Sequence, residues 1–95
     1  MIQAKFGDKV IAASDDTVVV EGNHYFPRDS VNMELFAESA TPYTCPWKGV
    51  AQYFDLRLDG RIIDDAAWSY PEPKPAAKQI AGHLAFDRSK GITVN

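Results

Sequence analysis

The residues best suited to chemistry gather in one stretch, TCPWKG, which spans residues 44–49 and holds the only cysteine of the chain. A thiol becomes nucleophilic when a nearby cation or histidine lowers its pKa, and Lys48 or His83 would play that part for Cys45. This pattern predicts a small enzyme, a thiol- or acid/base-dependent transferase or hydrolase. Free cysteines are also among the most buried residue types, so a packed, structural Cys45 stays open.

Lys48 offers a second chemistry, because it stands between a tryptophan and a glycine and would leave a tight turn beside an aromatic ring. A lysine ammonium in that position binds a ligand carboxylate or phosphate as a point charge. Its alternative role is structural, with the stem packed over Trp47 or the ammonium paired with Asp64. Gly49 is expected to meet a backbone requirement of the turn.

Aromatic residues form a third group. Trp68 and Tyr70 alternate with Ser69, so they share a face in an extended strand. Tyrosine hydroxyls and an indole N–H beside charged groups are typical of a small-ligand pocket, although the same residues would also build a second small core. The leading hypothesis is therefore a small-molecule-binding domain with a pocket between two sheets. Its expected ligand-binding residues are Tyr43, Cys45, Trp47, Lys48, Tyr53, Asp64, Trp68, Tyr70 and His83.

Composition and charge restrict the other function classes. The net charge of −3 and the lack of a basic block argue against nucleic-acid binding. One cysteine and two distant histidines predict neither a disulfide nor a metal site, and no cofactor is expected. The N-terminal residues 1–16 contain no continuous apolar run, so we expect no signal peptide, no membrane span and a cytoplasmic setting. A protein–protein interaction module is a further alternative, and the oligomeric state stays open.

Turn residues divide the 95-residue chain into short strands with no internal repeat, which predicts a single domain over residues 1–95. The expected strands outside the central hairpin are residues 2–6, 10–13, 17–20, 25–26, 83–86 and 92–94. The second hairpin is expected to turn at Gly22 and Asn23. Residues 31–36 fit either a strand or the end of a helical turn begun at 27–30. Pro75 can open a short helix near residues 75–81 that ends at Gly82.

The central hairpin is the clearest unit, because Asp59 and Gly60 form a two-residue type I′ loop between β-rich runs. Counting outward from this loop pairs Leu58 with Arg61, Leu56 with Ile63, Asp55 with Asp64, Tyr53 with Ala66, and Ala51 with Trp68. One face then carries Phe54, Leu56, Leu58 and Ile63, and the other carries Tyr53, Asp55, Arg57, Asp64 and Trp68. The opposed carboxylates of Asp55 and Asp64 form either a functional pair or a pair neutralised by Arg57 or Lys48. A β-bulge would change this register.

Three segments together resemble a known family: HYFPRDSV at 24–31, TPYTCPWKGVAQYF at 41–54 and DDAAWSYPEP at 64–73. They are similar to the domain of unknown function family 427, some members of which carry a nucleotidyltransferase-like label. The resemblance implies a mainly β domain of the β-tent kind, in which two antiparallel sheets lean on one another as in methionine sulfoxide reductase B and the drug-binding domain of cereblon. Such relatives often hold zinc through four cysteines, whereas Cys45 stands alone here, so zinc is not expected. The Gly-Ser pair and spaced carboxylates of nucleotidyltransferases are also missing.

Overall fold

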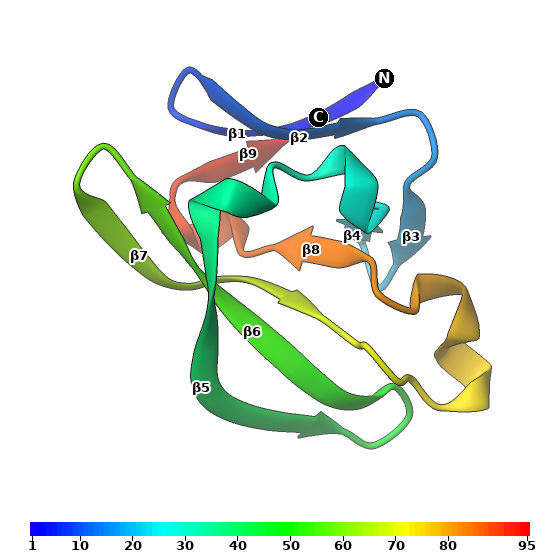
Figure 1. Ribbon diagram of the computed structural model, residues 1–95. Helices are drawn as coiled ribbons and strands as arrows, with labels where there is room; N and C mark the ends of the chain where they lie inside the picture. Colours follow the sequence, from blue (N-terminus) through cyan, green and yellow to red (C-terminus); the bar gives the residue numbers. More distant parts are fainter.

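The computed structural model describes residues 1–95, which form nine strands and four short 3₁₀ helices (Figure 1). In chain order the elements are β1 (Ile2–Phe6), β2 (Lys9–Ser14), β3 (Val18–Val20), β4 (Asn23–Tyr25), η1 (Arg28–Ser30), η2 (Met33–Leu35), β5 (Phe36–Cys45), β6 (Gly49–Leu58), β7 (Arg61–Ser69), η3 (Pro75–Ile80), β8 (Leu84–Phe86), η4 (Arg88–Lys90) and β9 (Ile92–Val94). The expected mainly β fold of one small domain is confirmed.

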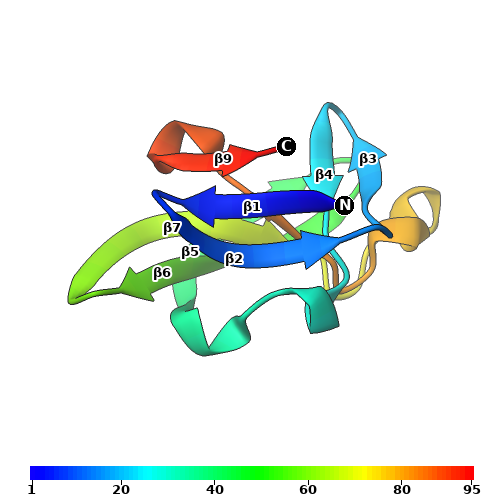
Figure 2. The same ribbon diagram turned by 90° about the horizontal axis from the view of Figure 1, so that it is seen from above.

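The strands form three antiparallel sheets, ordered β2-β1-β9, β3-β4 and β5-β6-β7-β8, and none of them closes into a barrel. Two of these sheets correspond to the pair that the family resemblance implied. The third is the β3–β4 hairpin, which pairs with neither of the others as a strand neighbour and lies at one end of sheet β2-β1-β9 (Figure 2). This hairpin contributes residues to the second core and to the candidate site.

The four-stranded sheet buries both of its faces. Directly opposed residues share a face and neighbours alternate, so Phe54, Ala67 and Phe86 point to one side while Tyr53, Trp68 and Ala85 point to the other. The first side packs against sheet β2-β1-β9 and forms the larger core, with Ala4, Ile11, Ala12, Phe26, Val31, Phe54, Leu56, Ala66, Ala67, Leu84, Phe86 and Ile92. Leu58 and Ile63 pack against this core, as the hairpin pattern predicted.

The second side has a smaller core of its own, made of Val20, Tyr25, Cys45, Ala51, Tyr70, Ala77, Ile80 and Ala85, with Val18, Tyr53 and Trp68 packed against it. The β3–β4 hairpin contributes Val20 and Tyr25, and η3 contributes Ala77 and Ile80. The expected helix at 75–81 is thus a 3₁₀ segment that begins at Pro75, and Ala77 interrupts it with a non-helical φ of −119°. Six residues are too few for a stable α-helix in isolation, and docking of Ala77 and Ile80 fixes the shape of this segment.

Some elements differ from the sequence expectation. Strand β5 was not predicted, because its sequence FAESATPYTC has no alternation and contains Pro42. It lies at the edge of its sheet, where a proline is tolerated because the missing N–H faces solvent. The β3–β4 turn consists of Glu21 and Gly22, one residue earlier than expected. Both have positive φ values, 54° and 79°, which is typical of a type I′ turn.

The predicted register of the central hairpin holds at its tip and fails beyond Leu56. Leu56 pairs with Ile63, but Phe54 pairs with Ala67, so Asp55 faces a bulge of three residues, 64–66. The expected pairing of Asp55 with Asp64 is therefore wrong. Asp65 takes a φ of 50° in the bulge, and its N–H donates to the Asp55 carboxylate over 2.8 Å. The register shifts by two residues, an even number, so Tyr53 and Trp68 still share a face and lie directly opposite each other.

The bulge yields a stability prediction at Asp65. A β-branched residue resists the left-handed conformation, which costs about 1–2 kcal/mol for an L-residue, and the Thr41 hydrogen bond to the Asp65 carboxylate would also be lost. We expect Asp65→Val to lower the free energy of unfolding in urea by more than about 1 kcal/mol. Asp65→Asn, which tolerates positive φ, should change it by less than about 0.5 kcal/mol.

The matched control is Asp64→Val, because Asp64 is exposed and is not among the residues with positive φ. Its effect should be small. Equal losses of stability for valine at positions 64 and 65 would show that the backbone conformation of the bulge carries no special constraint.

Candidate functional site

The TCPWKG segment is the turn between β5 and β6, closed by the pairing of Cys45 with Gly49. Gly49 has a φ of 111°, which only glycine adopts readily, so the backbone requirement expected there is confirmed. The proline-rich connection after β7 holds this turn in place. The Lys74 N–H donates to the Lys48 carbonyl over 2.9 Å, and the Lys74 ammonium donates to the Pro46 carbonyl over 2.6 Å.

This turn directs Lys48 into the molecule rather than into solvent. The residue is 7% exposed, one of three buried polar or charged residues in the chain. Its ammonium lies 5.4 Å from the centre of the Trp47 ring and 5.3 Å from that of Tyr70. Both distances fall within the range of cation–π attraction, which strengthens as the cation loses water.

The counter-ion of Lys48 is Glu21, at the tip of the β3–β4 hairpin. Burial alone would lower the pKa of Lys48, but the hydrogen bond to Glu21 and the nearby Tyr25 and Tyr70 phenols raise it above its usual value. The hydrogen bond from Lys48 lowers the pKa of Glu21, and Trp47 adds to this effect. The pair is thus fully charged at neutral pH. We call these five residues the Lys48 site: Glu21, Tyr25, Trp47, Lys48 and Tyr70.

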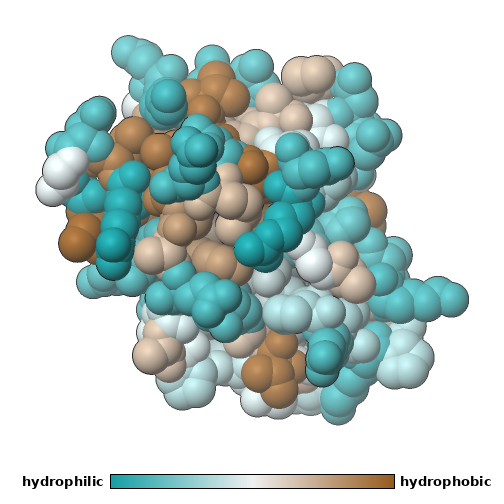
Figure 3. Space-filling model, viewed as in Figure 1, coloured by the Kyte–Doolittle hydropathy of each residue, from teal (hydrophilic) through white to brown (hydrophobic).

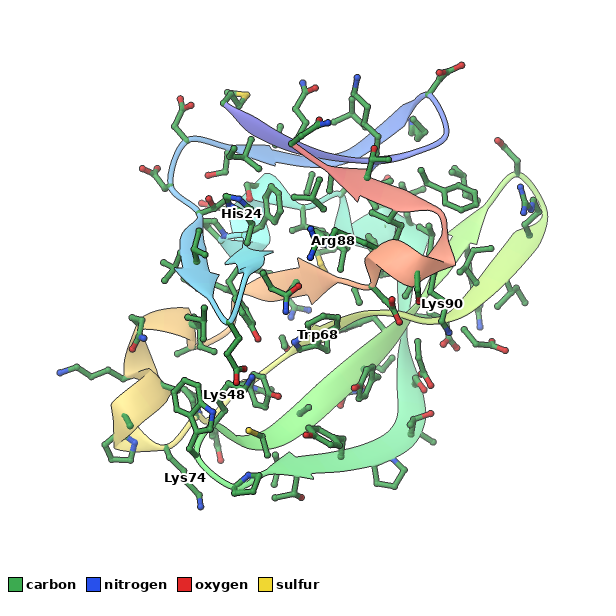
Figure 4. All side chains as sticks on the ribbon, turned by 180° about the vertical axis from the view of Figure 1, so that it is seen from behind. His24, Lys48, Trp68, Lys74, Arg88 and Lys90 are labelled. Carbon is green, nitrogen blue, oxygen red and sulfur yellow. The ribbon has the colours of Figure 1, made fainter.

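A row of aromatic side chains extends from the Lys48 site along the same face of the sheet. Ring centres of neighbours lie 6.4–6.5 Å apart in the order Tyr43, Tyr53, Trp68, Tyr25. The Trp68 indole N–H donates to the Tyr25 hydroxyl over 3.1 Å, which connects this aromatic row to the Lys48 site. Figure 4 shows Lys48 and Trp68 on the same side of the four-stranded sheet. Burial raises the pKa of Tyr70 to about 12, so its hydroxyl keeps its proton at neutral pH.

The exposure of these aromatic residues varies widely. Tyr43 is 47% exposed and Trp47 is 38% exposed, whereas Tyr70 is buried and belongs to the second core. Of the two alternatives for this aromatic group, the structure shows the second small core. Tyr70 is part of a small core beneath the proline-rich connection, and Tyr43 and Trp47 present ring surface to solvent.

Three other predicted site residues, Cys45, His83 and Asp64, are not members of the Lys48 site. Cys45 is buried in the second core near Tyr70. His83 follows η3 and its ring Nδ1 donates to the Ala81 carbonyl over 3.1 Å, while no hydrogen bond joins it to Cys45 or Lys48. Asp64 is exposed and its carbonyl accepts from Lys90, so Lys48 pairs with Glu21 and not with Asp64.

Three hollows open on the surface, and none is lined by the nine predicted ligand-binding residues. One hollow has lining residues that follow Lys48 and Tyr70 closely in the sequence. Its volume is about 240 Å³ and it is lined by Val50, Ala51, Gln52, Pro71 and Glu72. The largest, about 470 Å³, lies between the β1–β2 and β6–β7 turns, a corner where hydrophobic side chains gather in Figure 3. Glu21 and Tyr25 of the β3–β4 hairpin are the neighbours of the buried Lys48 side chain.

No three histidine, cysteine, aspartate or glutamate side chains converge closely enough to hold a metal ion. None of the helical turns has the length and apolar character of a membrane span.

Sequence reasoning missed two members of the site, Glu21 and Tyr25. Glu21 was not among the candidate residues, and no local signal identifies a counter-ion that lies 27 residues from its lysine. Tyr25 does belong to HYFPRDSV, one of the three segments that carried the family resemblance. That segment was therefore the available signal for Tyr25.

Comparison with known proteins agrees with the resemblance seen in the sequence. The family model described as a domain of unknown function, DUF427, matches residues 1–94, and its short name carries a nucleotidyltransferase label. A search of curated proteins found no match. The matched residues include every strand of the fold and all members of the Lys48 site.

The burial of Cys45 gives a prediction on reactivity. A buried thiol with no hydrogen-bonded cation or histidine is shielded from alkylation. We expect Cys45 to react with iodoacetamide at neutral pH only at the rate of local opening, and rapidly in urea, as followed by mass spectrometry. Rapid labelling of the folded protein, with a midpoint below the ordinary thiol pKa of about 8.5, would revive the thiol enzyme hypothesis.

The ion pair gives a prediction on pH. Because the pKa of Glu21 is lowered in the folded protein, its stabilising effect is present above the usual value of 4.5 and is lost as the pH falls through the folded value. We expect wild type to have a higher Tm than Glu21→Gln well above pH 4.5, and the difference to vanish well below it. Glu34→Gln, which changes an exposed glutamate with no side-chain hydrogen bond or ion pair, should show no such pH-dependent difference.

Proposed function

Because the chain belongs to the DUF427 family and its matched segments build the Lys48 site, we propose that this protein is a binding domain for a small organic anion. The anionic group of the ligand pairs with the Lys48 ammonium, and an attached ring lies against the exposed aromatic surface of Trp47 or of the aromatic row. A lone cysteine suits the reducing cytoplasm, where this proposal places the protein.

One observation carries the proposal. The Lys48 side chain is 9% exposed, whereas the carboxylate residue that neutralises it is 53% exposed. Compared with a pair of apolar side chains, such an ion pair adds little to the stability of the fold, because replacing a buried pair by apolar side chains is often neutral or stabilising. A buried lysine between two rings with a displaceable partner is instead the arrangement that an anion-binding site requires.

The aromatic residues favour a ligand that contains a ring. Trp47 lies within cation–π distance of Lys48 and is 38% exposed, so one part of its ring surface faces the ammonium while another is open to a ligand. Tyr43 is 47% exposed at the outer end of the aromatic row. Offset or edge-to-face contacts with such rings contribute about 0.5–1.5 kcal/mol beyond the area they bury.

Binding is favoured over catalysis by the environment of the reactive groups. The Cys45 thiol is buried and His83 makes its hydrogen bond to a backbone carbonyl. Nucleotidyl transfer relies on carboxylates that hold metal ions around the transferred phosphate. The charged groups of the Lys48 site are one lysine and one glutamate, and no cluster of three metal-ligating side chains lies anywhere in the chain.

The proposal is tested by binding of matched ring compounds. Phenylacetate, phenyl phosphate and the neutral phenylacetamide would be titrated into ¹⁵N-labelled protein, with the two indole N–H signals of Trp47 and Trp68 as reporters. We expect at least one of the two anions to bind, with shifts at Trp47, and the amide to bind at least tenfold more weakly. A tenfold loss corresponds to about 1.4 kcal/mol, within the range of one charge-assisted hydrogen bond.

Lys48→Met is the matched variant, because methionine keeps the apolar stem and removes the buried charge. We expect it to fold, with loss of anion binding. Lys78→Met, at an exposed lysine of η3, should bind as wild type does. The proposal is refuted if phenylacetate and phenylacetamide bind with equal affinity. It is also refuted if Lys48→Met binds the anions as wild type does.

A further inference from the structure

Glu21 already occupies the position in which an anion would meet Lys48. Its carboxylate accepts a hydrogen bond from the Lys48 ammonium, and Trp47 also favours its charged form. We infer that the natural ligand of this site is a monocarboxylate that displaces Glu21, and that the β3–β4 hairpin opens to admit it. This inference rests on the proposed function, and it adds the chemical class of the ligand and the element that competes with it.

The charge balance around Lys48 selects a carboxylate. One ammonium faces one carboxylate, and the other polar neighbours are the Tyr25 and Tyr70 phenols, which raise the pKa of Lys48. Burial holds the Tyr70 phenol in its protonated form at neutral pH, so it brings no charge to the site. A carboxylate in place of Glu21 keeps this balance. A phosphate monoester carries a charge of about −1.5 to −2 at pH 7 and would leave excess negative charge in a largely desolvated place.

The tip of the hairpin is built to separate from the sheet while its base stays fixed. The base is held by Tyr25, which is fully buried and accepts from Trp68, and by its strand partner Val18, which packs against the second core. Val20 directly precedes the turn and is also buried, so the tip that separates is the Glu21-Gly22 turn. Only three residue pairs join β3 to β4. At the tip, Glu21 and Gly22 are exposed, and a Cβ placed on Gly22 would meet no atom within 4 Å. Figure 2 shows this turn projecting beyond the neighbouring sheet.

Beyond the packing of Val20, the tip is attached to the four-stranded sheet through the side chain of Glu21. Among side-chain hydrogen bonds and ion pairs, the bond that the Lys48 ammonium donates to Glu21 is the one that joins Glu21 or Gly22 to that sheet. A buried ammonium left without a partner is unfavourable, so Glu21 departs only when another anion takes its place. The hairpin therefore excludes neutral molecules and competes with every anion that enters.

The experiment compares the affinity of phenylacetate for wild type, Glu21→Gln and Glu34→Gln by calorimetry and NMR titration. Glu21→Gln removes the internal carboxylate and keeps the length of the side chain, so phenylacetate should bind about tenfold more tightly than to wild type. Glu34→Gln carries the same change of charge on an exposed residue and should bind with wild-type affinity. Amide exchange at β3 and β4 should accelerate when phenylacetate saturates the wild-type protein, because Glu21 is released.

The outcomes separate this inference from the proposed function. Suppose that ring anions bind to wild type, that Lys48→Met abolishes this binding, and that Glu21→Gln gives no increase in affinity. The displacement of Glu21 is then refuted and the anion-binding function stands. If phenyl phosphate binds Glu21→Gln more tightly than phenylacetate does, the carboxylate assignment is refuted. If neither phenylacetate nor phenyl phosphate binds wild type or Glu21→Gln at millimolar concentration, both the inference and the proposed function fail.

Discussion

The fold depends on one constraint, that the four-stranded sheet must bury apolar side chains on both of its faces. Strand β6 places Phe54 and Leu56 on one face and Ala51 and Tyr53 on the other, and each set belongs to or packs against a separate core. Sheet β2-β1-β9 covers the first face. The second face is covered by the β3–β4 hairpin and by η3, because in so short a chain no other sheet is available.

The candidate site follows from the way in which that second face is covered. The β3–β4 hairpin covers it with Val20 and Tyr25, and this docking brings the turn that follows Val20 to the β5–β6 turn. Glu21 meets Lys48 there. The contact thus depends on hydrophobic packing of the hairpin strands, while the charge lies on the turn that joins them.

Much of the fold was predictable because it is determined by local sequence. The Asp59-Gly60 turn and the core face of the central hairpin followed from turn chemistry and alternation, and both are present. Strand β5 was missed because an edge strand needs no alternation and tolerates Pro42. The bulge at Asp65 was not located, because aspartate tolerates a positive φ without requiring it, and only the pairing of Tyr53 with Trp68 reveals the shifted register.

The sequence by itself determined most of the strands, with β5 the exception, the tight turn before Gly49, and the shared face of Tyr53, Trp68 and Tyr70, because these follow from backbone sterics and from the period of a strand. Only the tertiary structure decided that Cys45 is packed away and that Lys48 pairs with Glu21. Such a contact joins groups far apart in the chain, and its formation depends on which face the hairpin covers. Packing of the whole chain determines that choice, and no local pattern records it.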